Sequence, residues 1–230
     1  MALSITVDTT GLQALAKQSS ALAKQLPFAV SLALNGSAKG SRSIPGSDAY
    51  NVVKALAGAS RGYFDQPTPF IEKAWRATNA NKANPEVTIY PEDKRVKYLK
   101  AHITGGARTY KGYEAKLLGL SNESVQALIP SFVKRNQAGN ATRGTLGKII
   151  QASAAKGPGS VLVGKPRGGN RPVGVYERTK QGSLKPLFVA QPTAIYRGGF
   201  PLSQTTATVI NRRFSSYLEA ALEQALKSAR

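Results

Sequence analysis

Hydrophobic positions at helical spacing dominate the two ends of the chain. From residue 12 to residue 34, leucine, alanine and valine recur three or four positions apart, with polar side chains between them. This pattern predicts a long amphipathic helix that reaches about Lys39. Pro27 lies within it and is expected to kink the helix or split it in two, because proline removes a helical hydrogen bond. A second apolar stripe over residues 210–225 predicts a long C-terminal helix from about residue 202 to residue 229.

Short strands are predicted at the N-terminus and between these helices, and two of them, residues 3–7 and 86–90, alternate apolar and polar positions. The predicted strands are residues 3–7, 86–90, 160–163, 174–178 and 187–190. The last two are separated by Gln181-Gly182-Ser183, which predicts a hairpin turn. Thr10, with Gln13 three positions later, predicts a capping box at the start of the first long helix.

The middle of the chain, residues 40–160, has weaker patterns and many glycines and prolines. We expect a short helix over residues 49–57. Two prolines in residues 66–71 predict extended backbone there. Residues 72–78 fit either a short helix or an extended segment.

Two further helices are expected in this middle region. One covers residues 94–103, where apolar side chains recur at helical spacing, and Gly105 is expected to stop it because glycine tolerates the left-handed turn. The other is capped by Thr142 or Thr145 and is expected to end near Gly157.

Strands and helices that occupy separate stretches of the chain are typical of the α+β class. We therefore predict an α+β fold: a small antiparallel sheet flanked by the long N-terminal and C-terminal helices, with an irregular basic middle region. Residues 1–230 are expected to form a single domain, in which residues 40–160 are insertions or arms.

The chain has a large excess of positive charge. Its net charge is +20, from 32 Lys and Arg against 12 Asp and Glu, and residues 101–200 carry 15 of the basic and 3 of the acidic side chains. A charge of this size attracts polyanions and acidic protein surfaces. Charge does not choose between these partners, because phosphate and carboxylate groups fit the same arginine geometry. A merely solvated basic surface is the third alternative.

The stretch of residues 94–118 is the centre of this charge. It contains seven basic side chains, three interleaved tyrosines and only one acid, Glu114. The part after Gly105-Gly106 is expected to be a basic loop. A second basic, glycine-rich turn covers residues 164–172. The predicted partner-binding residues are Lys94, Arg95, Lys97, Tyr98, Arg108, Tyr110, Lys111, Tyr113, Lys116, Lys165, Arg167 and Arg171.

Residues that support catalysis or metal binding are sparse. The chain has no cysteine and one histidine, His102, which argues against thiolate nucleophiles, disulfides and clustered metal ligands. Residues 159–165 match the first seven positions of a phosphate-binding loop, but Pro166 replaces the required Ser or Thr and the Val-Leu-Val interior predicts a strand. Glu92-Asp93 opens a predicted helix, where negative charge offsets the helix dipole. We predict no enzymatic activity, no cofactor and no metal ion.

Three sets of short segments carry a resemblance to a known family. The first set is residues 6–12, 26–30 and 33–35 (TVDTTGL, LPFAV, ALN). The second is residues 98–99, 105–108 and 111–112 (YL, GGAR, KG). The third is residues 174–178, 184–189, 196 and 200–202 (GVYER, LKPLFV, Y, FPL). In this order they resemble the minor tail and tail-completion proteins of long-tailed bacteriophages, the group that includes minor tail protein Z of lambda-like phages; residues 40–90 carry none of the likeness.

The resemblance implies a structural virion protein without catalysis, located at the head-proximal end of the tail and assembled in the host cytoplasm. Its implied partners are further copies in a homo-oligomeric ring and the tail terminator, tail tube and connector, with possible contact to passing DNA. Arg108 and Lys111, with Tyr110 and Tyr113, are expected to anchor one such contact. The N-terminus shows no basic leader and no apolar signal-peptide core, so we expect a soluble protein without membrane contact.

Two other functions stay open at this point. A nucleic-acid-binding protein is the alternative that charge favours, and it predicts salt-sensitive DNA binding by the isolated chain. An enzyme such as a nuclease would need metal-dependent turnover, and no paired-carboxylate spacing supports it.

Overall fold

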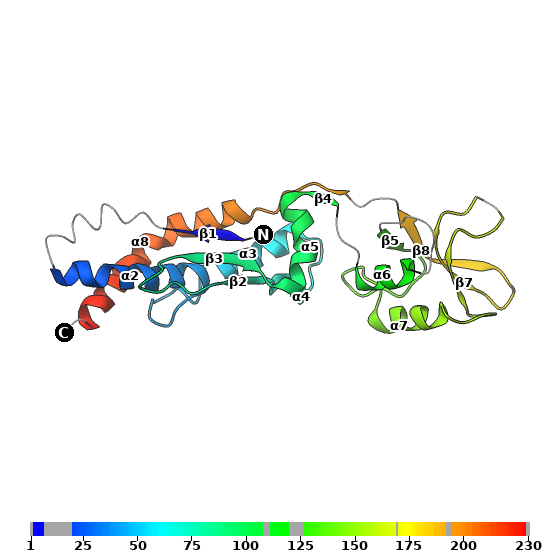
Figure 1. Cartoon of the computed structure of the whole chain (residues 1–230), viewed down its shortest axis with the longest axis horizontal. Coiled ribbons are helices and arrows are strands. Elements are labelled where there is room, and N and C mark those ends of the chain that lie inside the picture. Colours follow the sequence, from blue (N-terminus) through cyan, green and yellow to red (C-terminus); the bar gives the residue numbers. More distant parts are fainter. Residues whose placement is uncertain are drawn as a thin grey trace. The chain divides into compact units, whose positions relative to one another are not determined.

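The computed structural model describes residues 2–6, 20–107, 111–119, 127–168, 170–191 and 195–228. The chain divides into two compact units, one of residues 1–99 with 199–230 and one of residues 100–198 (Figure 1). The predicted α+β class is confirmed, with a long helix near each end of the chain and antiparallel sheets between them. The single domain with insertions at residues 40–160 stays a prediction; the observed division falls at residues 100 and 198.

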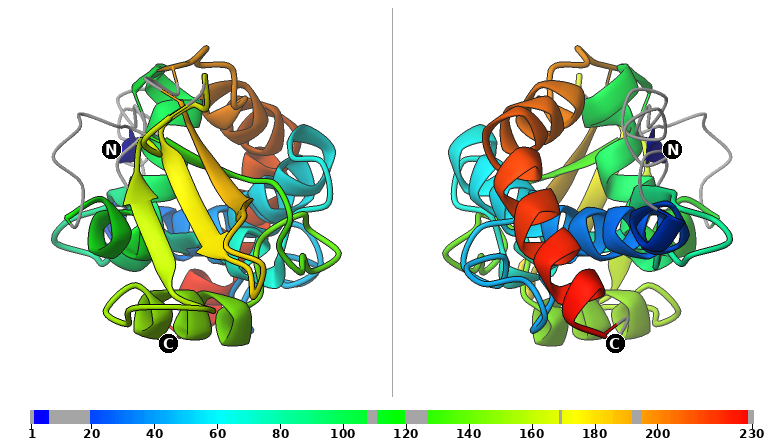
Figure 2. Two further views of the ribbon diagram at one scale, coloured as in Figure 1. Left: turned by 90° about the vertical axis from the view of Figure 1, so that its right-hand side faces the viewer. Right: turned by 90° about the vertical axis from the view of Figure 1, so that its left-hand side faces the viewer.

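Two long helices form the body of the first unit. Helix α2 (Ser20–Lys39) crosses helix α8 (Leu202–Ser228), and the pair is visible in the right-hand view of Figure 2. Helix α2 ends at Lys39 as predicted and continues through Pro27, so the predicted split does not occur. Val7 and the predicted Thr10–Gln13 capping box lie outside the described residues.

Helices α3 (Val52–Tyr63) and α4 (Pro69–Glu72) follow in the same unit. Helix α3 begins later than the predicted residues 49–57, because the side chain of Asn51 caps it by accepting the Lys54 backbone N–H at 3.1 Å. The extended backbone predicted for residues 66–71 is wrong in its second half. Pro69 occupies the first turn of a helix, where its missing N–H costs no hydrogen bond.

A three-stranded antiparallel sheet completes the first unit. Its strand order is β1 (Leu3–Ile5), β3 (Val87–Pro91) and β2 (Trp75–Ala77). Of the two alternatives predicted for residues 72–78, a short helix or an extended segment, the extended one is observed at β2. Trp75 anchors this strand: it stacks on Phe200 at a centroid distance of 5.2 Å, and its indole N–H donates to Ser60 Oγ at 3.2 Å.

Helix α5 (Asp93–Thr104) confirms the helix predicted for the central basic stretch. It ends at Thr104, directly before Gly105, whose φ of +75° and close approach to the Gly198 backbone both require glycine. Strand β4 (Gly106–Ala107) follows at once and pairs with β9 (Ile195–Tyr196).

The second unit is built on a four-stranded antiparallel sheet. Its strand order is β5 (Ala127–Pro130), β8 (Leu184–Gln191), β7 (Gly174–Arg178) and β6 (Val161–Gly164). This is the small sheet predicted from residues 160–190, and the hairpin turn at Gly182 (φ +80°) is confirmed. The long helices α2 and α8 belong to the other unit, where α2 contacts β2 and β3 and α8 packs on α2 and α3.

Helices α6 (Gly112–Leu118) and α7 (Arg143–Ala152) supply side chains to the core of this unit. Of the two predicted caps, Thr142 and Thr145, the structure shows Thr142 as the N-cap of α7. Helix α7 ends at Ala152, before the predicted end near Gly157. The loop predicted after Gly105-Gly106 is wrong over α6. This helix forms because Leu117 enters the core and Glu114 accepts hydrogen bonds at its start.

Candidate partner-binding surface

The first group of predicted binding residues lies on α5, and Arg95 in this group is occupied by contacts within its own unit. Its Nη1 donates to the carboxylate of Glu92 and, at 2.5 Å, to the carbonyl oxygen of Lys73. Its guanidinium lies 4.8 Å from the ring centroid of Phe70, close enough for a cation–π contact. Arg95 therefore holds α5 against α4 and the turn after it, and it is a poor candidate for a partner contact.

The other three α5 residues differ in exposure. Tyr98 is half-buried and meets Phe70 edge-on at a centroid distance of 5.7 Å. Lys94 and Lys97 are exposed, and Lys97 Nζ lies 5.2 Å from the Tyr98 ring centroid. The accessible charge of this group thus comes from the two lysines.

Glu114, near the start of α6, is the one acid that the sequence analysis noted among the seven basic side chains of residues 94–118. It is fully buried, and its carboxylate accepts the backbone N–H of Lys111 at 2.7 Å and that of Leu128 at 3.1 Å. It therefore ties the start of α6 to β5. Because Glu114 is buried, its negative charge does not offset the exposed basic side chains of residues 94–118 at the surface.

The predicted residues on α6 are only partly available to a partner. Tyr113 tilts against Phe188 of the core at a centroid distance of 5.7 Å, and Lys111 is half-buried with Nζ 3.5 Å from Asn140 Oδ1. Lys116 is exposed. The predicted residues Arg108 and Tyr110 lie outside the described part of the chain.

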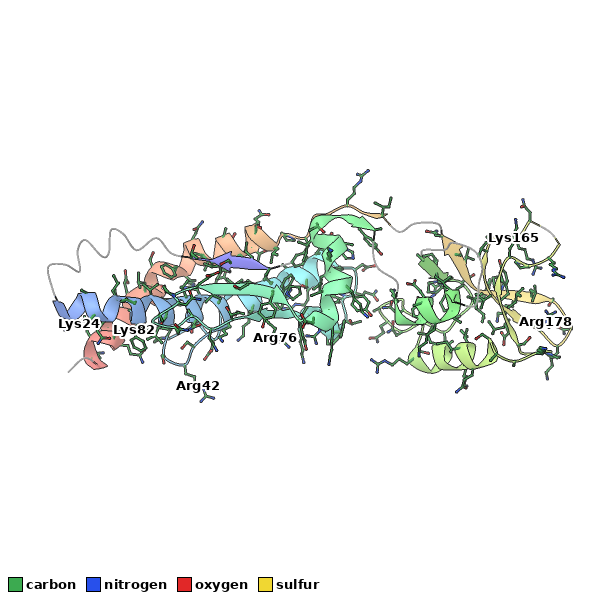
Figure 3. The ribbon with its side chains drawn as sticks, viewed as in Figure 1. Lys24, Arg42, Arg76, Lys82, Lys165 and Arg178 are labelled. Carbon is green, nitrogen blue, oxygen red and sulfur yellow. The ribbon has the colours of Figure 1, made fainter. Side chains whose placement is uncertain are left out.

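The third group lies in the loop that joins β6 to β7. Lys165 and Arg167 are both exposed, and within the described residues neither makes a hydrogen bond or an ion pair (Figure 3 labels Lys165). Arg171 is exposed as well, but its Nη1 donates to the carbonyl oxygen of Leu184 at 3.0 Å and so fastens the loop to β8. Lys165 and Arg167 are therefore available for a partner, as are the exposed Lys94 and Lys116 of the other two groups.

The structure places the described members of the predicted set at three separate elements: α5, α6 with its cap, and the β6–β7 loop. The α5 group (Lys94 to Tyr98) lies in the first unit, and the other two groups lie in the second. The prediction of one binding stretch over residues 94–118 thus combined residues from two units.

The second unit carries most of the charge. Residues 100–198 contain 16 Lys and Arg against 3 Asp and Glu, a net charge of +13. Of these acids, the structure describes Glu114, which is buried, and Glu177, which is half-buried. The described surface of this unit is therefore almost entirely of one sign, which favours a polyanionic or acidic partner.

The second unit also exposes apolar side chains that the sequence analysis did not predict as part of a surface. Phe132 is 63% exposed, directly after β5, and Lys185 Nζ lies 5.8 Å from its ring centroid. Ile129 on β5 is 44% exposed. The next residue, Val133, packs against the core. Because neighbouring side chains of extended backbone point to opposite sides, this position could have indicated from the sequence that Phe132 is exposed.

Three titratable groups have shifted pKa values. Burial lowers the pKa of His102, whose ring lies 4.5 Å from that of Tyr196, so the imidazole is neutral near pH 7. Burial raises the pKa of Tyr176, while the positive charge of Arg171 opposes the shift. Burial likewise raises the pKa of Tyr217, whose hydroxyl donates to the carbonyl oxygen of Tyr50 at 2.8 Å.

Within the described residues, no group of three or more His, Cys, Asp and Glu side chains could hold a metal ion. The described helices include none that is long and apolar enough to cross a membrane. Comparison with protein-family models, with curated proteins and with solved structures found no match.

Proposed function

We propose that this chain is a non-catalytic structural protein of a bacteriophage tail, located at its head-proximal end and acting in tail completion or head–tail joining. In this proposal it works by protein–protein contacts in a ring of copies, next to the tail terminator, tail tube and connector. The family resemblance of the three sets of segments supports the proposal. The observation that carries it is the nearly one-signed surface of residues 100–198, which suits a protein that adheres to acidic neighbours.

A double charge reversal tests this proposal. Lys165→Glu with Arg167→Glu replaces two predicted binding residues of one loop that are exposed and have no described partner, so the monomer is expected to stay folded. We expect particles assembled with this variant to contain heads and tails that fail to join, and infectious titre to fall. The measurement is electron microscopy of purified particles combined with plaque counts.

The matched control reverses two exposed lysines of the other unit, Lys24→Glu with Lys82→Glu (labelled in Figure 3), which changes net charge by the same amount. The control is expected to leave titre near that of the wild type. Normal titre from the Lys165 and Arg167 variant, or absence of the protein from mature particles, would refute the proposal.

The second candidate function is direct binding of DNA, which the exposed Lys165 and Arg167 also favour. The two candidates differ in what the isolated protein does. DNA binding predicts a complex of the isolated chain with duplex DNA that weakens steeply as salt rises, whereas the tail proposal predicts little binding before assembly. A salt titration followed by fluorescence anisotropy distinguishes them.

A further inference from the structure

The four-stranded sheet has two edges, and its β5 edge is closed to further pairing. The backbone N–H of Ser131 donates to the carbonyl oxygen of Leu187 on β8 at 2.9 Å, and Ile129, two residues earlier, also pairs with β8. Since backbone groups alternate in direction along an antiparallel strand, those of Leu128 and Pro130 point away from β8. The N–H of Leu128 is bonded to the Glu114 carboxylate at 3.1 Å. Pro130 has no N–H. No outward donor of β5 is left for another strand, and such closure is a known protection of sheet edges.

The opposite edge, β6, is open in the described part of the chain. Arg178 N–H donates to the Ser160 carbonyl at 2.9 Å, and the ladder continues through Leu162 opposite Tyr176. The alternate residues Val161 and Val163 therefore point their backbone groups away from β7. The described residues place no strand beyond β6, so these N–H and C=O groups form an unpaired edge.

A hollow of about 450 Å³ lies beside the start of this edge. Val161 and Leu162 of β6 line it, together with Ser160 and the basic side chains of Lys156 and Arg178. An open backbone edge next to a side-chain pocket is the arrangement by which proteins add a peptide strand to a sheet: the backbone supplies affinity and the pocket supplies specificity.

Exposed cations flank the edge at both ends. Lys156 and Arg178 lie at the start of β6, and Lys165 and Arg167 follow its end (Figure 3 labels Lys165 and Arg178). Four residues of strand span roughly 13 Å, at about 3.3 Å per residue. An extended segment with carboxylates on both sides of its centre would therefore meet a cation at each end.

We propose that the β6 edge binds an extended, acidic segment of a partner protein by strand addition. The segment pairs with the backbone of Val161 and Val163 and places one side chain in the hollow beside Leu162. This inference deepens the proposed function and rests on it for the identity of the partner as a neighbouring tail protein.

The charges argue against the other occupants. A second copy of the chain pairing edge to edge would bring Lys156, Lys165 and Arg178 of both copies together, and like charges oppose that pairing. Nucleic acid would use the cations but leave the backbone groups of Val161 and Val163 unpaired. Strand addition by an acidic segment satisfies both sets of groups.

The test introduces into β6 a proline, the residue that removes an outward N–H from β5. Val163→Pro removes an outward N–H without touching the β6–β7 ladder, since proline is tolerated at edge positions whose N–H faces solvent. Val163→Ala is the matched control, because it removes the same side chain and keeps the N–H. The probe is a fluorescein-labelled peptide with alternating threonine and valine in its centre and two glutamates at each end, and binding is followed by anisotropy.

We expect the wild-type protein and Val163→Ala to bind the peptide with affinities within about twofold of each other. Val163→Pro should weaken binding by about tenfold, the effect of one or two lost hydrogen bonds. The wild-type protein should show the same loss with a peptide N-methylated at alternate backbone amides, a comparison that needs no protein variant. Lys156→Glu with Arg178→Glu should also weaken binding, because both side chains are exposed and flank the hollow.

Three results would overturn the inference. Equal affinity for the N-methylated peptide, or for oligoglutamate of the same charge, would show that charge alone attracts the probe. Tight binding of a ten-nucleotide single strand that displaces the peptide and is unaffected by Val163→Pro would indicate a nucleic-acid surface. Self-association in sedimentation that Val163→Pro abolishes, without peptide binding, would identify a second copy as the occupant. None of these readouts involves virions, so failure here is distinct from failure of the proposed function.

Discussion

Glu114 is a fully buried carboxylate inside the more basic of the two units. Two backbone N–H groups, of Lys111 and Leu128, donate to it, one from the start of α6 and one from the edge of β5. Hydrogen bonds to a charged acceptor are stronger than those between neutral groups. One side chain therefore caps a helix, joins it to the sheet and closes a strand edge.

Replacing Glu114 by alanine is expected to destabilise the protein strongly. Glu114→Ala leaves two N–H groups without their acceptor, and we expect a loss of about 2–4 kcal/mol in the free energy of unfolding. Glu114→Gln keeps one acceptor oxygen and should lose less. Urea denaturation followed by circular dichroism measures both.

Glu177→Ala is the control for this prediction, because Glu177 is the other described acid of the unit and is half-buried on β7. Its effect is expected to stay within about 0.5 kcal/mol. Similar losses from Glu114→Ala and Glu177→Ala would show that the buried hydrogen bonds are not what makes Glu114 important.

Single-residue roles were the hardest part to predict from sequence. Local spacing placed Glu114 and Arg95 among basic neighbours, and nothing in that spacing reveals that Glu114 meets Leu128 or that Arg95 meets Phe70. These contacts depend on the path of the chain in space. Lys165 and Arg167 were predicted to lie in a basic turn, and both are exposed in the loop after β6, because a loop rich in glycine and proline leaves long charged side chains in solvent.

The pair of long helices in the first unit depends on small side chains at its contact. Ala29 and Ala33 of α2 and Ala221 and Ala225 of α8 are fully buried and belong to one core cluster. Alanine at such positions allows helices to approach closely, and it also leaves little space for larger side chains.

Enlarging one of these alanines is expected to separate the helices. Ala221→Leu should lower the free energy of unfolding by about 1–3 kcal/mol, because overpacking forces side chains from their preferred rotamers. Ala207→Leu is the matched control on the same helix, since Ala207 is exposed, and it should be nearly neutral. Thermal denaturation compares the two variants, and equal effects would argue against tight packing at Ala221.

Element-level prediction succeeded where a pattern was long enough to repeat. The end of α2 and nearly all of α8 followed from apolar spacing over several turns. Strand β3 followed from alternation, and β6 and β7 were predicted as short strands with nearly the observed bounds. Helices α4 and α6 are four and seven residues long, too short for a helical period to show. Their formation depends on local caps and on tertiary contacts, such as Pro69 in the first turn of α4 and Leu117 in the core.

At the scale of the whole molecule, charge is divided unequally between the two units. Residues 100–198 have a net charge of +13, whereas residues 1–99 with 199–230 carry 16 basic and 9 acidic side chains, a net charge of +7. A surface of one sign is not complementary to its own copy. If the proposed ring forms, contacts between copies therefore involve the first unit, and the second unit faces partners of opposite charge.

The same asymmetry predicts that the two units respond differently to salt. Lowering ionic strength from about 1 M to about 0.01 M lengthens the Debye screening distance from about 3 Å to about 30 Å and so strengthens repulsion among like charges. We expect backbone amides of β7 and β8 to exchange faster at low salt, and those of α2 and α8 to change less, in hydrogen-exchange mass spectrometry. The Lys165→Glu and Arg167→Glu variant should reduce the difference, because it removes four units of net charge from the more basic unit. Equal salt dependence in both units would show that self-repulsion does not limit the stability of residues 100–198, and it would weaken the argument that this unit needs an acidic partner.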